Sequence, residues 1–115
     1  MMNCSEKICD YIDKYDSKFK GMAVLNKERC TEVALSCGII DKFSDEYNFI
    51  TVDFGIDSKT GRLTIEIISD DLTLDNEYAG YIFKIIDYTS SLEFRHMDSE
   101  HIKIVLCFEG IWDFE

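Results

Sequence analysis

The sequence predicts a single α+β domain in which two β-hairpins form a mostly antiparallel sheet and helices pack on one face of that sheet. Three observations support this prediction. In residues 1–43 the apolar side chains recur at helical spacing, whereas later they alternate with polar ones in two separate stretches. A third helical segment lies between these two stretches. We therefore expect the order α-α-β-β-α-β-β, and 115 residues leave no room for a second core.

The first helix is predicted over residues 4–20. Asn3 is a suitable N-cap because its side-chain oxygen can accept a hydrogen bond from the first turn. Gly21 can adopt the left-handed conformation that ends a helix. The apolar residues lie on one stripe of this helix: Ile8, Ile12, Tyr15 and Phe19.

The second helix is predicted to begin after Asn26, another N-cap candidate, and to end at Gly38. Its apolar stripe is formed by Cys30, Val33, Ala34 and Cys37. The apolar segment 22–25 between the two helices could instead form a short strand.

The first hairpin follows from an alternation with a period of two in residues 47–67. One face is expected to carry Ile50, Val52, Phe54 and Ile56, and on the returning strand Leu63, Ile65 and Ile67. Between the strands, Asp57 favours the first position of a type I turn, and Gly61 supplies the positive φ of a following bulge.

A third helix is predicted from about residue 75 to residue 90, capped by Asp75. Its broad apolar face includes Tyr78, Ala79, Ile82, Ile85 and Ile86. A second hairpin follows, with its loop near residues 97–99. We expect a register that places Leu92 opposite Ile104, Phe94 opposite Ile102, and Glu93 opposite Lys103. The apolar tail 111–114 should dock onto the core or onto another subunit.

The charge is distributed unevenly along the chain. The net charge is −11, from 12 basic and 23 acidic residues. Residues 1–43 contain seven of each and are neutral, so residues 44–115, the ββαββ part, carry the entire surplus with five basic and sixteen acidic residues. An acidic protein repels phosphate backbones and anionic lipid surfaces, so we expect binding to neither nucleic acid nor membranes. A one-sided acidic field favours a basic protein partner.

The cysteines and the N-terminal segment favour a cytoplasmic protein. The five Cys residues show no CxxC spacing, as expected for free thiols in a reducing compartment. The N-terminal segment has no apolar stretch of the kind found in secretory signals, and the uncharged run 33–40 is too short to span a membrane.

Motifs that would indicate catalysis or cofactor binding are missing from the sequence. There is no GxGxxG, no P-loop and no nucleophile elbow, and the acidic stretch 69–77 lacks the ligand spacing of an EF-hand. His96 and His101 flank the last hairpin loop and are expected to face opposite ways, which disfavours a shared metal. We therefore expect no catalytic residue, no cofactor and no metal.

These observations favour a small acidic, non-enzymatic protein-binding module of the regulator, inhibitor or immunity type, whose ββαββ surface meets a basic protein. The candidate interaction residues are Asp53, Glu66, Asp70, Asp71, Tyr78, Tyr81 and Trp112. An alternative is a homo-oligomeric domain that binds a small ligand at an aromatic pocket or interface formed by the tyrosines of the third helix and Trp112. A further alternative is an enzyme that uses Cys107 or His101 with a nearby carboxylate.

Overall fold

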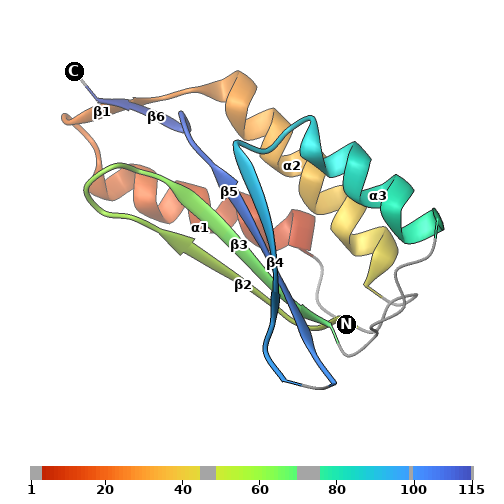
Figure 1. Ribbon diagram of the computed structural model, residues 1–115. Helices are drawn as coiled ribbons and strands as arrows, with labels where there is room; N and C mark the ends of the chain where they lie inside the picture. Colours follow the sequence, from red (N-terminus) through yellow and green to blue (C-terminus); the bar gives the residue numbers. More distant parts are fainter. Residues whose placement is uncertain (1–3, 45–48, 70–75, 99, 115) are drawn as a thin grey trace.

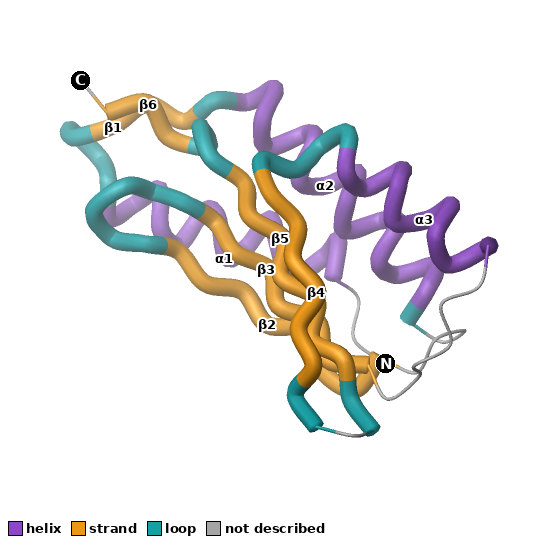
Figure 2. Tube along the Cα trace, in the orientation of Figure 1, coloured by secondary structure: helices purple, strands orange, loops and turns teal. Residues whose placement is uncertain are grey.

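The computed structural model of the protein describes residues 4–44, 49–69, 76–98 and 100–114. The described part forms an α+β domain with helices on one side of the main sheet (Figures 1 and 2). The elements, in chain order, are α1 (Cys4–Lys18), β1 (Ala23–Leu25), α2 (Lys27–Phe43), β2 (Phe49–Ile56), β3 (Leu63–Ser69), α3 (Asn76–Ile86), β4 (Ser91–His96), β5 (Ile102–Phe108) and β6 (Trp112–Phe114).

The main sheet joins the two predicted hairpins. Its strand order is β2-β3-β5-β4, and each neighbouring pair is antiparallel. The predicted fold class is thus confirmed. Two short strands extend the predicted order, since β1 and β6 pair antiparallel and form a second sheet. Segment 22–25 therefore does contain a strand, and the apolar tail docks within the chain itself, with Ile111 and Trp112 buried.

The core lies between the helices and the inner face of the sheet. Burial alternates along β3, which confirms the predicted period of two there, whereas on β5 Val105 and Cys107, predicted to face outward, are also buried. Ile8, Ile12 and Phe19 of the predicted α1 stripe are buried, and Phe19 packs against Trp112 and Phe114 of β6, whereas Tyr15 is half-buried. The opposite face of the sheet is not covered by any described helix (Figure 1).

Helix α1 is capped by a residue far away in the sequence. The amide of Cys4 donates to Oδ1 of Asp41 at 2.6 Å, and the amide of Ser5 donates to Oδ2 at 3.1 Å. The Ser5 hydroxyl donates to the same Oδ2 at 2.9 Å. Asp41 thereby satisfies the free amides at the positive end of α1 and ties α1 to α2. The predicted cap, Asn3, lies outside the described residues.

Helix α2 begins as predicted and ends later. The Asn26 side chain accepts a hydrogen bond from the Arg29 amide, so this N-cap is confirmed. The helix continues through Gly38 to Phe43, so the predicted end was wrong. A helical glycine costs about 1 kcal/mol relative to alanine, but burial of Ile40 and Phe43 in the core outweighs that cost.

The β2–β3 hairpin confirms the predicted turn. Gly61 has φ of 70°, and the Asp57 carboxylate accepts hydrogen bonds from the amides of Lys59 and Thr60. The prediction that Ile50 points inward was wrong, because this residue is 53% exposed. The register shifts between Phe49 and Thr51, so Ile50 lies at an irregularity that turns it out of the core.

The β4–β5 register differs from the predicted one by two residues along β5. Leu92 is opposite Leu106, and Phe94 is opposite Ile104. Glu93 is opposite Val105 rather than Lys103. The predicted opposite-charge pair therefore does not set this register. His96 pairs with Ile102, and beyond this pair the Met97 amide donates to the His101 carbonyl.

Helix α3 is shorter than predicted and ends at Ile86. Ile82 and Ile85 are buried as expected, but Ala79 and Ile86 are exposed, so the predicted apolar face was too broad. The predicted cap, Asp75, lies outside the described residues. Contacts from α2 hold the residues after Ile86 in a non-helical conformation.

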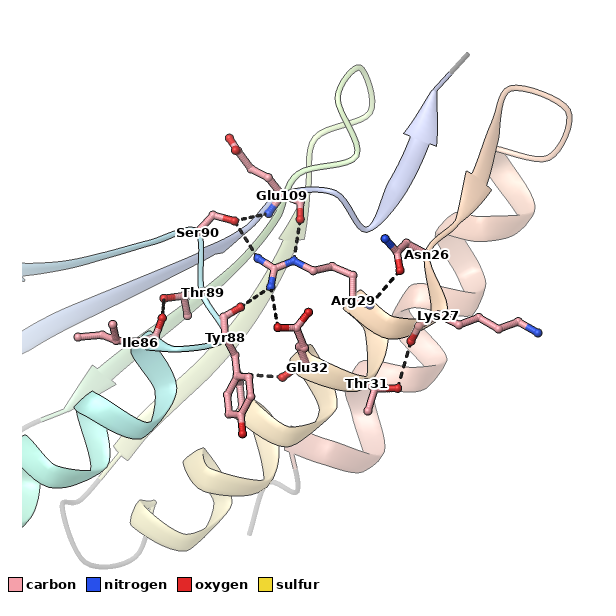
Figure 3. Close-up of polar contacts among 11 residues, drawn as sticks. Asn26, Lys27, Arg29, Thr31, Glu32, Ile86, Tyr88, Thr89, Ser90 and Glu109 are labelled. Atoms are coloured by element: carbon pink, nitrogen blue, oxygen red, sulfur yellow. Dashed lines mark hydrogen bonds and ion pairs between the residues drawn. The ribbon is translucent and has the colours of Figure 1, made fainter.

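Those contacts come from the Arg29 side chain on α2 (Figure 3). Its Nε donates to the Glu109 carbonyl at 2.8 Å, Nη1 to the Tyr88 carbonyl at 2.6 Å, and Nη2 to Oγ of Ser90 at 2.8 Å. Glu32, one turn later on α2, lies 3.4 Å from Nη1. Arg29 therefore connects α2 with the α3–β4 link and with the segment that follows β5.

We expect Arg29→Ala to lower the free energy of unfolding by about 3 kcal/mol, because two carbonyls lose their charged donor. Arg29→Lys should lose an intermediate amount, since one ammonium cannot reproduce the three-way geometry of a guanidinium. Urea denaturation measures both. A loss for Arg29→Ala no larger than that for Lys27→Ala, an exposed position on the same helix, would contradict the role of Arg29.

We expect Asp41→Ala to lower the free energy of unfolding by about 1 kcal/mol, because the first turn of α1 loses its cap. Asp10→Ala, at an exposed position on α1, is the matched control and should change stability by less than about 0.5 kcal/mol. Urea denaturation followed by circular dichroism measures both, and equal effects would argue against the cap.

Candidate interaction surface

The uncovered face of the main sheet carries charges arranged in rows. The strand registers place Asp53 opposite Glu66, Glu66 opposite Val105, and Val105 opposite Glu93, so three carboxylates lie in one row across the sheet. In the next row, Lys103 lies opposite Arg95. The two predicted interaction residues Asp53 and Glu66 are thus cross-strand neighbours on this face. Like charges in directly opposite positions repel each other.

The basic residues of part 44–115 are mostly held in ion pairs within it. Nζ of Lys103 lies 3.4 Å from Oε1 of Glu66, and Nη2 of Arg95 lies 2.6 Å from Oε2 of Glu93. Nε of Arg62 lies 4.0 Å from Oε1 of Glu109. The row of carboxylates on the sheet is therefore partly neutralised, and its charge is lower than the sequence alone suggests.

A second set of carboxylates in part 44–115 is exposed and forms no ion pair among the described residues. This set comprises Asp53, Asp57, Glu77, Asp87, Glu100 and Asp113. Its members lie on β2, in the β2–β3 turn, at both ends of α3, in the β4–β5 loop and on β6. These described carboxylates are therefore spread over several elements and do not form one patch.

The uncovered face is hollowed at one end. The hollow has a volume of about 590 Å³, and Thr64, Ser91, Arg95, Val105 and Cys107 are among its lining residues. This lining mixes hydroxyls, charges of both signs and apolar groups. Among the described residues, no group of three or more His, Cys, Asp or Glu side chains has the geometry to hold a metal ion.

Of the predicted aromatic interaction residues, the two with described side chains, Trp112 and Tyr81, have separate contacts and line no common pocket that the structure shows. Trp112 is 3% exposed, its Nε1 donates to Oδ1 of Asp16 at 2.9 Å, and its ring packs edge-on against Phe19. The Tyr81 ring packs against Phe43, with centroids 3.8 Å apart, and Nζ of Lys84 lies over the Tyr81 ring, 5.5 Å from its centroid. Of the remaining predicted residues, Asp70 and Asp71 lie outside the described residues, as does the side chain of Tyr78.

All five cysteines are free thiols. Cys4 and Cys37 are buried, and a hydrogen bond with Cys4 followed by burial raises the pKa of Cys37 above its ordinary value. Cys30, predicted on the buried stripe of α2, is only half-buried, and burial raises its pKa as well. A raised pKa keeps these two thiols protonated at neutral pH, so they act as small apolar groups.

His101 forms a local contact in the β4–β5 loop. Its Nδ1 lies 2.8 Å from Oδ1 of Asp98. The same carboxylate accepts hydrogen bonds from the amides of Glu100 and His101, and the Glu100 amide contributes most to a pKa of Asp98 below its ordinary value. These contacts tie Asp98 to Glu100 and His101. The side chain of His96 lies outside the described residues.

The sequence did not indicate the bare sheet face, the alternating rows of charge or the hollow, because all three depend on strand order. The only available signal was the presence of polar residues at alternate positions of β2, β3, β4 and β5, which predicts a solvated face for each strand but not which strands are neighbours.

The turn carboxylate Asp57 should make stability depend on pH. The amides of Lys59 and Thr60 lower the pKa of Asp57 below its ordinary value, so its stabilising effect is complete above about pH 4 and is lost as the pH falls through the lowered pKa. We expect wild type to be more stable than Asp57→Ala at pH 7 and this difference to shrink below about pH 4. Urea denaturation at several pH values measures it, and a difference independent of pH would contradict the assignment.

Comparison with known proteins adds no relative. Protein-family models, curated proteins and solved structures give no match to this chain.

None of the helices among the described residues is long and apolar enough to cross a lipid bilayer.

Proposed function

We propose that the protein is a non-enzymatic protein-binding module whose acidic part, residues 44–115, binds a basic protein. The observation that carries the proposal is the pairing pattern of the charges. Three of the five basic residues of this part form ion pairs with carboxylates of the same part, whereas six other exposed carboxylates form no ion pair with any residue that the structure describes. The acidic surplus is therefore available to act on a partner.

The spread of these carboxylates indicates how the binding would work. Separate exposed charges contribute little to affinity individually, but together they generate a negative potential around this part of the molecule. Such a potential accelerates encounter with a basic protein and repels nucleic acid and anionic membranes. The five free thiols suit a reducing compartment, so we place this interaction in the cytoplasm.

The test uses two triple variants with the same change in charge. The first neutralises exposed acids of the acidic part: Asp53→Asn, Asp87→Asn and Glu100→Gln. The control neutralises exposed acids of the neutral part: Asp10→Asn, Asp13→Asn and Glu28→Gln. The partner is first captured from host extract at low salt, identified, purified and titrated against each protein.

We expect the wild-type affinity for a basic partner to fall steeply as the salt concentration rises. At low salt the first variant should bind roughly tenfold more weakly, whereas the control should lose much less. A partner without a basic surface, an affinity independent of salt, or equal losses in the two variants would overturn the proposal.

A further inference from the structure

β4 is an edge strand of the main sheet. Within the described residues it pairs with β5 only. The Met97 amide donates to the His101 carbonyl, which directs Met97 toward β5. Because successive residues of an antiparallel strand direct their backbone groups to opposite sides, Arg95 and Glu93 also bond toward β5. Leu92 and Phe94 therefore direct their amides and carbonyls to the open edge.

An exposed apolar stripe of α3 lies at the same end of the molecule as this edge. α1 contacts β2, α2 contacts α1, and α3 contacts α2, so α3 is the helix farthest from β2 and nearest to β4. Its exposed residues Ala79, Phe83 and Ile86 are spaced i, i+4 and i+7 and share one stripe. Phe83 is 67% and Ile86 41% exposed.

The stripe faces away from α2. Tyr81 packs against Phe43 of α2, while Ile82 and Ile85 face the core. Successive residues of a helix are about 100° apart around its axis. Around α3, the side chains therefore follow one another from Tyr81 through the two core isoleucines to Ile86 and Phe83. The stripe thus lies on the side of α3 opposite to α2, beyond the edge of the helix layer.

Phe94 on β4 adds to this apolar surface. It lies opposite the buried Ile104, so its side chain is on the helix side of the sheet, yet it remains 45% exposed. The two side chains that flank it, Glu93 and Arg95, lie on the uncovered face. One edge of the domain therefore combines open backbone groups, an exposed aromatic ring and an apolar helix stripe.

A second copy of the chain complements this edge in charge. If two β4 strands pair antiparallel about a two-fold axis at Phe94, then Glu93 of each strand lies opposite Arg95 of the other. The open backbone groups of Leu92 and Phe94 meet partners in the same register. A two-fold axis at Glu93 or at Arg95 would instead bring like charges together.

We propose that the protein forms a two-fold symmetric dimer through β4, which extends the main sheet across two subunits. The Phe94 rings meet at the axis, and the α3 stripes pack against each other on the helix side. The contact removes the exposed apolar side chains and the open strand edge from water in one step.

This proposal is independent of a basic partner, and salt separates the two. Each chain carries a net charge of −11, so two copies repel each other at long range. Raising the salt concentration screens this repulsion and should strengthen the dimer, whereas it weakens binding to a basic protein. If either the dimer or the binding to a basic protein is absent, the other interaction can still be measured through its own dependence on salt.

The decisive experiment uses two charge reversals, Glu93→Arg and Arg95→Glu, in the full chain. In each variant alone, the dimer would place like charges opposite each other, so we expect dimerisation at least about tenfold weaker than in wild type. In an equimolar mixture, the heterodimer has opposite charges at both positions and should form. Sedimentation velocity over a concentration series measures the association, with one variant fluorescently labelled.

This mixing experiment separates an interface from a local structural effect. Both variants lose the Glu93–Arg95 ion pair within the strand, so a structural defect would persist in the mixture. Heterodimer formation supports the proposal. A wild-type protein that stays monomeric up to its solubility limit, or a mixture as monomeric as its components, would overturn it.

A second pair of variants tests the α3 stripe. Phe83→Glu should weaken dimerisation at least about tenfold, since it places a carboxylate in the apolar contact. Leu35→Glu, at a 50% exposed position on α2, is the matched control and should not weaken it. Equal weakening by the two substitutions would exclude α3 from the interface.

Discussion

The guanidinium group of Arg29 connects α2 to two segments that are far away in the sequence. From the first turn of α2 it bonds to Tyr88 and Ser90 on the way into β4 and to Glu109 at the end of β5 (Figure 3). The positions at which α3 stops and β4 starts both depend on these contacts. The Ser90 hydroxyl also accepts a hydrogen bond from the Glu109 amide, which closes the network between the two strands of the second hairpin.

Other contacts between residues far apart in the sequence also hold the fold together. Asp41 near the end of α2 caps the start of α1, and Trp112 near the end of the chain donates to Asp16 of α1. The N-terminal helices and the C-terminal strand are thus tied together by buried or half-buried polar contacts. Among the described residues these ties leave the β4 edge uncovered, and our dimer proposal rests on that edge.

The charge of the protein shows why composition and surface must be distinguished. The acidic surplus of residues 44–115 suggested a negative surface over the whole ββαββ part. The strand order brings Lys103 to Glu66 and leaves Arg95 beside Glu93, so the sheet face is nearly balanced. The other carboxylates that the structure describes lie on β2 and β6, in turns and loops, and at both ends of α3. In the proposed function this charge acts through a long-range field rather than through a shaped acidic site.

The sequence by itself determined the elements whose signals are local. The periods of Ile8, Ile12 and Phe19 and of Leu63, Ile65 and Ile67, the Asn26 cap and the Asp57–Gly61 turn all require only nearby residues. Tertiary structure decided where α2 and α3 end, the β4–β5 register, the exposure of Ile50 and the burial of Trp112. Each of these depends on a partner tens of residues away, such as the core around Phe43 or the Arg29 side chain. Local propensities differ by about 1 kcal/mol or less, so burial and charged hydrogen bonds of larger magnitude override them.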